Sequence, residues 1–140
     1  MTDGDAATRL IEVLDELVGD ELRGVVMFTP ETAEVAYLRD DLQGVVNLHD
    51  FEPTIDQARE LNETLYRVGE LQGGTLGRPA GNVAVFEHSI VVVLAYEPAG
   101  GVVVTLEHTA EISLSGFVKE CVAALYDEPP ATRQLDPRNQ

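Results

Sequence analysis

The sequence is poor in cysteine, in lysine and in aromatic residues. Its single cysteine, Cys121, has no second cysteine with which to form an internal disulfide, which fits a reducing compartment. Cys121 also lies in an apolar helical pattern, so we interpret it as a small core residue rather than a nucleophile. No signal-peptide pattern opens the chain, and the longest apolar run, Ile90 to Tyr96, is too short to span a bilayer. We therefore expect a cytoplasmic protein that has no membrane partner.

Positive charge is also scarce. The chain has 25 acidic residues and 9 basic ones, which give a net charge of -16 at pH 7. Such a field repels nucleic acid and anionic membranes, and no basic patch offsets it. Lys119 is the single lysine, and the other basic residues are arginine. This composition is typical of salt-in halophiles, in which molar KCl screens the charge, and we favour that origin over an ordinary acidic mesophilic protein.

Apolar residues are plentiful, at 44% of 140 residues, which is enough for the core of one domain. We expect residues 1–5 to be frayed, residues 6–126 to form a single domain, and the polar, proline-containing residues 127–140 to be a mobile tail. No internal repeat or low-complexity tract suggests a different organisation.

Three segments have the apolar spacing of a helix. The first runs from Ala6 to Gly19, where a glycine is placed to end it. The second runs from Thr54 to Leu71, and Thr54 with Gln57 has the spacing of a capping box. The residues before it, 44–53, are expected to be irregular. The third runs from a Ser113 cap to about Tyr126.

Five segments have the composition of strands. Residues 25–29 and 34–38 flank a turn that contains Pro30, and residues 82–87, 90–96 and 101–107 are joined by short turns, which predicts antiparallel neighbours. The last two are apolar on both faces, so helices must cover both sides of the sheet. We predict a three-layer α/β (α+β) domain with a five-stranded antiparallel sheet in the order α-β-β-α-β-β-β-α.

This element order resembles the roadblock and dynein light-chain domain, a relative of the longin and profilin-like folds, over about residues 6–126. The stretches AYLRDDL (36–42) and FVKECVAALYD (117–127) also resemble an uncharacterised family of small haloarchaeal proteins, a domain of unknown function. The first resemblance implies a module that dimerises and docks protein partners, as relatives do when they scaffold or regulate small GTPases and motors. The second implies no activity.

The glycine-rich stretch LQGGTLGRPAG (71–81) is the most conspicuous motif. A phosphate-binding P-loop needs a strand before it, a helix after it and a Lys-Ser or Lys-Thr pair, and this stretch has the reverse order and no such pair. We interpret it as a helix end followed by a loop. If the loop binds a carboxylate or phosphate, Arg78 is the candidate contact.

No other constellation indicates an enzyme, a cofactor site or a metal site. His88 and His108 lie at the same end of the predicted sheet, and we interpret them as exposed histidines at strand ends rather than as metal ligands. Tyr37, Arg39, Asp40 and Asp41 form a candidate interaction surface at a strand end, with a merely solvated strand end as the alternative.

We therefore predict a non-catalytic protein-interaction or regulatory scaffold module, with a homodimer and an unidentified protein as its expected partners. A small-molecule sensor is the alternative. It would require an apolar pocket of the PAS or profilin kind, with tyrosines such as Tyr37, Tyr66 and Tyr96 as donors.

Overall fold

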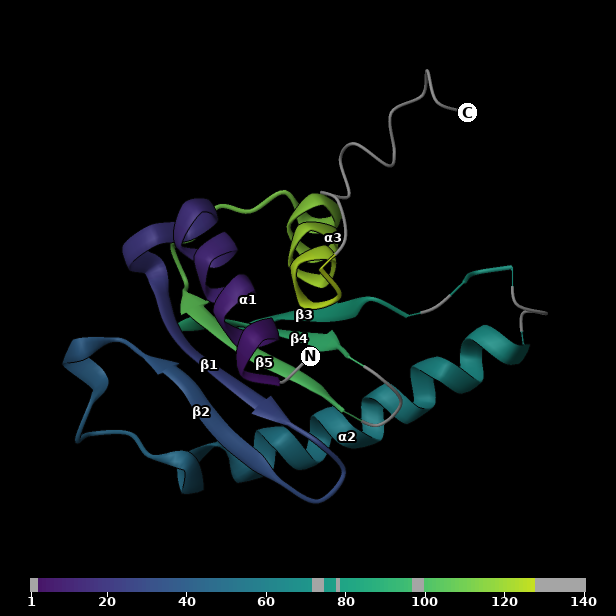
Figure 1. Ribbon diagram of the computed structural model, residues 1–140, viewed down its shortest axis with the longest axis horizontal. Helices are drawn as coiled ribbons and strands as arrows, with labels where there is room; N and C mark the ends of the chain where they lie inside the picture. The colour runs from purple at the N-terminus through teal and green to yellow at the C-terminus, as the bar shows by residue number, and fades with distance from the viewer. Residues whose placement is uncertain (1–2, 72–74, 78, 97–99, 128–140) are drawn as a thin grey trace.

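The computed structural model describes residues 3–71, 75–77, 79–96 and 100–127 (Figure 1). Its strands form one five-stranded antiparallel sheet, in the spatial order β2-β1-β5-β4-β3. The strands are β1 (Leu22–Phe28), β2 (Ala33–Leu38), β3 (Gly81–Val85), β4 (Ser89–Ala95) and β5 (Gly101–Glu107). The helices are α1 (Asp3–Val18), α2 (Leu48–Leu71) and α3 (Leu114–Leu125), with short 3-10 turns after α1 and β2. The predicted antiparallel five-stranded sheet with three helices is confirmed.

The sheet joins two antiparallel units that the chain builds separately. The β1–β2 hairpin comes first, and β3, β4 and β5 follow as a meander. The pairing of β1 with β5 connects the two, from Leu22 opposite Leu106 to Phe28 opposite Gly101. Within the described residues, β2 and β3 are therefore the two edges of the sheet, and each has a strand neighbour on one side alone.

The helices pack on opposite faces of the sheet (Figure 1). α1 and α3 pack against each other and against one face, where Leu10, Leu14 and Cys121 meet the strand residues Val92 and Val104. On the other face, α2 contributes Ile55 and Ala58 to a smaller core with Val26, Val93 and Val103. The alternation along β4 and β5 thus supplies apolar side chains to two cores, which is why most residues of both strands are apolar.

Two polar side chains of α2 fix the helix over the centre and the β2 side of the sheet. Asn62, the one fully buried polar residue among those the structure describes, donates from Nδ2 to the Gly100 carbonyl oxygen at 3.1 Å. Arg59 donates to the carbonyl oxygens of Thr29 and Thr32, in the turn of the β1–β2 hairpin, at 2.9 and 3.0 Å. The position of α2 across the sheet is consequently set by hydrogen bonds to backbone as well as by apolar packing.

Two helices begin earlier than the sequence patterns indicate. α1 starts at Asp3 rather than Ala6, and Asp5 in its first turn is favoured by the helix dipole. α2 starts at Leu48 rather than Thr54, so the prediction that residues 48–53 are irregular was wrong.

The box that begins α2 is formed by Asn47 and Asp50, not by Thr54 and Gln57. Asp50 Oδ2 accepts a hydrogen bond from the Asn47 backbone N–H at 2.9 Å, the return contact of a capping box. Pro53 lies inside the second turn of α2. Proline usually disfavours a helix interior, which is why the residues before it resembled a loop.

Candidate functional site

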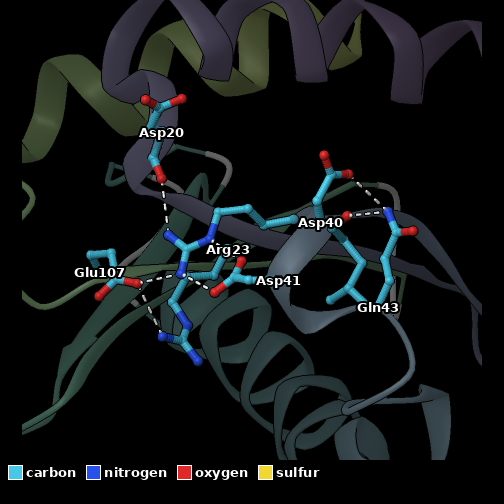
Figure 2. Close-up of polar contacts among 8 residues, drawn as sticks. Asp20, Arg23, Asp40, Asp41, Gln43 and Glu107 are labelled. Carbon is cyan, nitrogen blue, oxygen red and sulfur yellow. Dashed lines mark hydrogen bonds and ion pairs between the residues drawn. The ribbon is translucent and has the colours of Figure 1, made fainter.

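Arg39, one of the predicted surface residues, is the centre of a cluster of polar side chains where β1 begins and where β2 and β5 end. Figure 2 labels Asp20, Arg23, Asp41 and Glu107 of this cluster. The Arg39 guanidinium makes a two-pronged contact with Asp41, with Nε to Oδ1 at 2.6 Å and Nη2 to Oδ2 at 3.0 Å. Nη2 also donates to Glu107 Oε1 at 2.8 Å, and Nη1 donates to the Asp20 carbonyl oxygen at 2.9 Å. Arg23 donates to the same Glu107 oxygen at 3.1 Å.

Electrostatics within this cluster favour the charged forms. The hydrogen bond from Arg39 holds the pKa of Asp41 below its ordinary value, and hydrogen bonds and charge from Arg39 and then Arg23 do the same for the pKa of Glu107. The contacts with Asp41 and Glu107 raise the pKa of Arg39 in return. The side chains of Arg39 and Glu107 are about three-quarters buried, at 24% and 25% exposure. The cluster therefore acts as an ionic clamp on three strand ends.

The predicted interaction-surface residues that the structure describes have different contacts. Arg39 and Asp41 share the clamp, whereas the exposed Asp40 is within 3.4 Å of the Gln43 amide nitrogen. Tyr37 is partly buried and packs against the core on the α1–α3 side. Arg78 lies outside the described residues. Since the Arg39 guanidinium is engaged by Asp20, Asp41 and Glu107, an acidic partner would have to displace internal contacts to reach it.

His88 and His108 lie close together because their chain neighbours, Ser89 of β4 and Glu107 of β5, are paired in the sheet. The rings of His88 and His108 are 6.3 Å apart between centroids, in an edge-to-face arrangement. Within the described parts of the chain, no group of three or more His, Cys, Asp or Glu side chains is arranged to hold a metal ion.

Cys121 is completely buried in the core between α1 and α3. Burial, with a smaller contribution from the charge of Glu120, raises the pKa of its thiol to about 12. A thiol in that state is protonated at neutral pH and is a poor nucleophile, in agreement with its interpretation as a core residue.

An apolar concavity with a volume of about 420 Å³ lies between α2 and the β3–β4 side of the sheet. We call it the α2–β3 groove. The helix contributes Pro53, Thr54, Gln57, Ala58 and Leu61. β3 and β4 contribute Asn82, Ala84, Val91 and Val93, and the turn between them contributes Phe86. Not one of these ten side chains is charged, although the chain carries 25 acidic residues.

The groove exists because α2 does not cover the whole face of the sheet. Arg59 and Asn62 hold the helix toward the hairpin and the start of β5, and no other described helix covers the outer face of β3 and part of β4 on this side. Apolar groups are exposed as a result, with Leu61 at 38% and Phe86 at 56%. The Nδ2 atom of Asn82, also at the groove, is buried without a hydrogen-bond partner among the described residues.

The sequence patterns indicated an apolar stripe along α2 and did not indicate this groove. The stripe includes Leu61 and Val68, and the structure leaves Val68 39% exposed as well. A signal was present, because the apolar stripe of α2 continues for more turns than the short β3 and β4 can cover.

Comparison with known families identifies the family of this chain. Its sequence matches a domain of unknown function, DUF7522, over residues 8–126. The chain belongs to the DUF7522 family. No curated protein matches the sequence.

The DUF7522 region begins within α1 and ends just after α3, so it includes the clamp, the groove and every strand of the sheet. None of the helices in the described parts of this DUF7522 chain combines the length and the apolar character needed to cross a membrane. The family description carries no activity, and the geometry of the sites is therefore the basis for a functional proposal.

Proposed function

We propose that this protein is a non-catalytic protein-interaction module, a regulatory scaffold that docks a protein partner in the α2–β3 groove. The observation that carries the proposal is an uncharged, apolar groove of about 420 Å³ on a chain with a net charge of -16. Exposed contiguous apolar surface on a small domain marks interaction sites more often than chance.

Charge explains why a partner would use this face. A contact made over the acidic parts of the surface would bury carboxylates without partners, which costs free energy. A contact over the groove removes Leu61 and Phe86 from water and desolvates no ionised side chain of the lining. The groove is thus the surface on which association is least opposed by the charge of the chain.

The resemblance to roadblock domains supports the same class of function, because relatives of that kind dimerise and dock partners. We propose a roadblock-like three-layer arrangement and a homodimer on this basis. Sedimentation in molar KCl tests the homodimer directly, since a single species of monomer mass at all concentrations would contradict it.

We further propose a halophilic cytoplasm as its setting, from the -16 charge and the near absence of lysine. Screening by salt should reduce repulsion among the carboxylates of the folded chain. The urea midpoint of unfolding should therefore rise as KCl is added up to molar concentration, and a flat midpoint would contradict this setting.

The docking face is tested by capture of partners from native lysate in molar KCl, with two variants of equal charge. Leu61→Glu places a carboxylate in the groove, at a side chain with enough exposure to tolerate it. Val45→Glu, the control, places a carboxylate at an apolar residue that is 74% exposed and does not line the groove. We expect Leu61→Glu to reduce partner recovery at least tenfold and Val45→Glu to leave it unchanged. Equal recovery with both variants would contradict docking at the groove.

One observation favours the small-molecule sensor as a second candidate. The groove has the volume of a ligand pocket, and the Nδ2 of Asn82, which has no partner among the described residues, is a donor for a carbonyl group of an apolar ligand. Native mass spectrometry of freshly purified protein would reveal such a ligand. A bound small molecule that is lost in Asn82→Ala would replace the first proposal with this one.

A further inference from the structure

In the part of the chain that the structure describes, β3 is an open edge of the sheet. Among the described strands it pairs with β4 alone. The Phe86 N–H donates to the Ser89 oxygen at 2.8 Å, and the Ala95 N–H donates to the Ala80 oxygen at 2.9 Å. The backbone N–H and C=O groups of the even-numbered residues of β3 therefore face β4. Because backbone groups alternate along an antiparallel strand, the N–H and C=O groups of Gly81, Val83 and Val85 point away from the sheet. No backbone hydrogen bond from outside the sheet reaches them from the described residues.

Nothing in the sequence of β3 protects this edge. Natural proteins block open edges with charged residues, proline or a covering segment. Gly81 to Val85 contains neither charge nor proline, and Val85 is 74% exposed. The opposite edge, β2, carries the exposed Glu34. Pairing with an additional strand is therefore less hindered at β3 than at β2.

A hollow lies on each face of this edge. On one face is the α2–β3 groove, which Asn82 and Ala84 line. On the other is a second hollow of about 310 Å³ between β3 and α3, which we call the α3–β3 hollow; Val83, Leu114 and Lys119 are among its lining residues. Since side chains alternate between the faces of a strand, a strand added to β3 would direct its residues alternately toward the groove and toward the hollow.

Charge distinguishes the two sides. The groove is uncharged, and Lys119 is the one charged residue that lines the hollow. Lys119 makes no ion pair with any described residue, although acidic residues are nearly three times as numerous as basic ones. The complementary strand is apolar on the groove side and carries a carboxylate on the hollow side.

We propose that β3 accepts an extended segment of a partner protein by strand addition, with apolar residues facing α2 and an acidic residue facing Lys119. The inference rests on the proposed interaction function and specifies its partner. A second copy of this chain is a poorer occupant, because its own β3, GNVAV, has no acidic residue to meet Lys119.

The probe is a short, fluorescently labelled synthetic peptide that alternates valine with threonine and has one aspartate at a threonine position. Two control peptides accompany it. One has asparagine in place of the aspartate, and the other is N-methylated at alternate residues, so it has the same side chains but cannot complete the ladder. We expect the aspartate peptide to bind in molar KCl at least tenfold more tightly than the N-methylated one.

Variants of β3 separate backbone pairing from side-chain contact. Val83→Pro removes an N–H that points away from β4 and leaves the hydrogen bonds to β4 in place. Edge strands tolerate proline at such a position. Val83→Ala, its matched control, retains the N–H. We expect peptide affinity to fall at least tenfold in Val83→Pro and less than threefold in Val83→Ala. Lys119→Ala should weaken the aspartate peptide and leave the asparagine peptide unchanged.

Three results would overturn strand addition. These are equal binding of the N-methylated and unmodified peptides, equal affinity in Val83→Pro and Val83→Ala, and a dimer in which the Val83 and Val85 amides are protected from hydrogen exchange by the second copy. None of these results decides whether the protein is an interaction module. That proposal is tested separately, because Leu61→Glu can still abolish partner capture when Val83→Pro does not. Loss of capture in Leu61→Glu with full capture in Val83→Pro would retain the interaction module and exclude this mode of binding.

Discussion

Gly101 should not tolerate even one additional carbon atom. It is the first residue of β5 and lies between Ala95 of β4 and Phe28 of β1. A Cβ at this position would fall well inside van der Waals contact of the Leu94 carbonyl oxygen, 2.9 Å from Phe28 Cζ and 3.2 Å from Asn62 Nδ2. The Leu94 oxygen belongs to the backbone of a strand that is held on both sides, so it cannot move aside without loosening the ladder.

We expect Gly101→Ala to reduce the free energy of unfolding by about 3 kcal/mol, at the upper end of the range for overpacked cores. With a urea dependence of about 2 kcal/mol per molar, the unfolding midpoint would fall by about 1.5 M. The assay is urea unfolding in molar KCl, followed by circular dichroism. Urea is preferable to guanidinium chloride because urea leaves the screening of the acidic surface unchanged.

The matched control is the same substitution at Gly116 in α3. There the nearest atom to a new Cβ is Ser113 Oγ at 3.2 Å, a hydroxyl that can rotate away. Alanine is favoured over glycine in a helix, so Gly116→Ala should stabilise the protein by about 0.5 kcal/mol. The two substitutions therefore have opposite predicted signs. A Gly101→Ala protein as stable as the parent would refute the close approach of β4, β5 and α2 on which the position of the groove depends.

Two further predictions concern titratable groups. The pKa of Glu107 is lowered by Arg39 and Arg23, so its stabilising contribution is present above the unfolded pKa, near 4.3, and is lost as pH falls through the lower folded value. Glu107→Gln should hence destabilise the protein at pH 7 but not in acid. Glu111→Gln, the same substitution at an exposed side chain, is the matched control and should lower the urea midpoint at pH 7 less than Glu107→Gln does. Cys121, with its thiol pKa raised to about 12, should react with dithionitrobenzoate at neutral pH in urea and not in the native state; rapid native labelling would contradict its burial.

The helices and strands were predictable because their signals are local. The alternation in β4 and β5 and the helical spacing in α1 and α3 repeat within a few residues, and the structure places those elements close to the expected bounds. The start of α2 was missed because two local signals compete there. Pro53 indicates a break, whereas the Asn47–Asp50 contact begins the helix before it.

The candidate sites could not be predicted in the same way, because their residues are distant in the chain. Arg39 is 68 residues from Glu107, and the sequence around Arg39 does not indicate that Glu107 is its partner. The groove depends on which apolar positions of α2 remain uncovered, and that depends on where Arg59 and Asn62 reach the backbone of other elements.

The sequence by itself determined the antiparallel α/β class, the burial of Cys121 and the acidic surface, because composition and short-range periodicity are properties of the chain alone. Tertiary structure decided that β1 joins β5, that Arg39 is held inside an ionic clamp, and that an uncharged groove borders an open β3 edge. Each of these depends on the distance between residues far apart in the chain, and no local pattern encodes that distance.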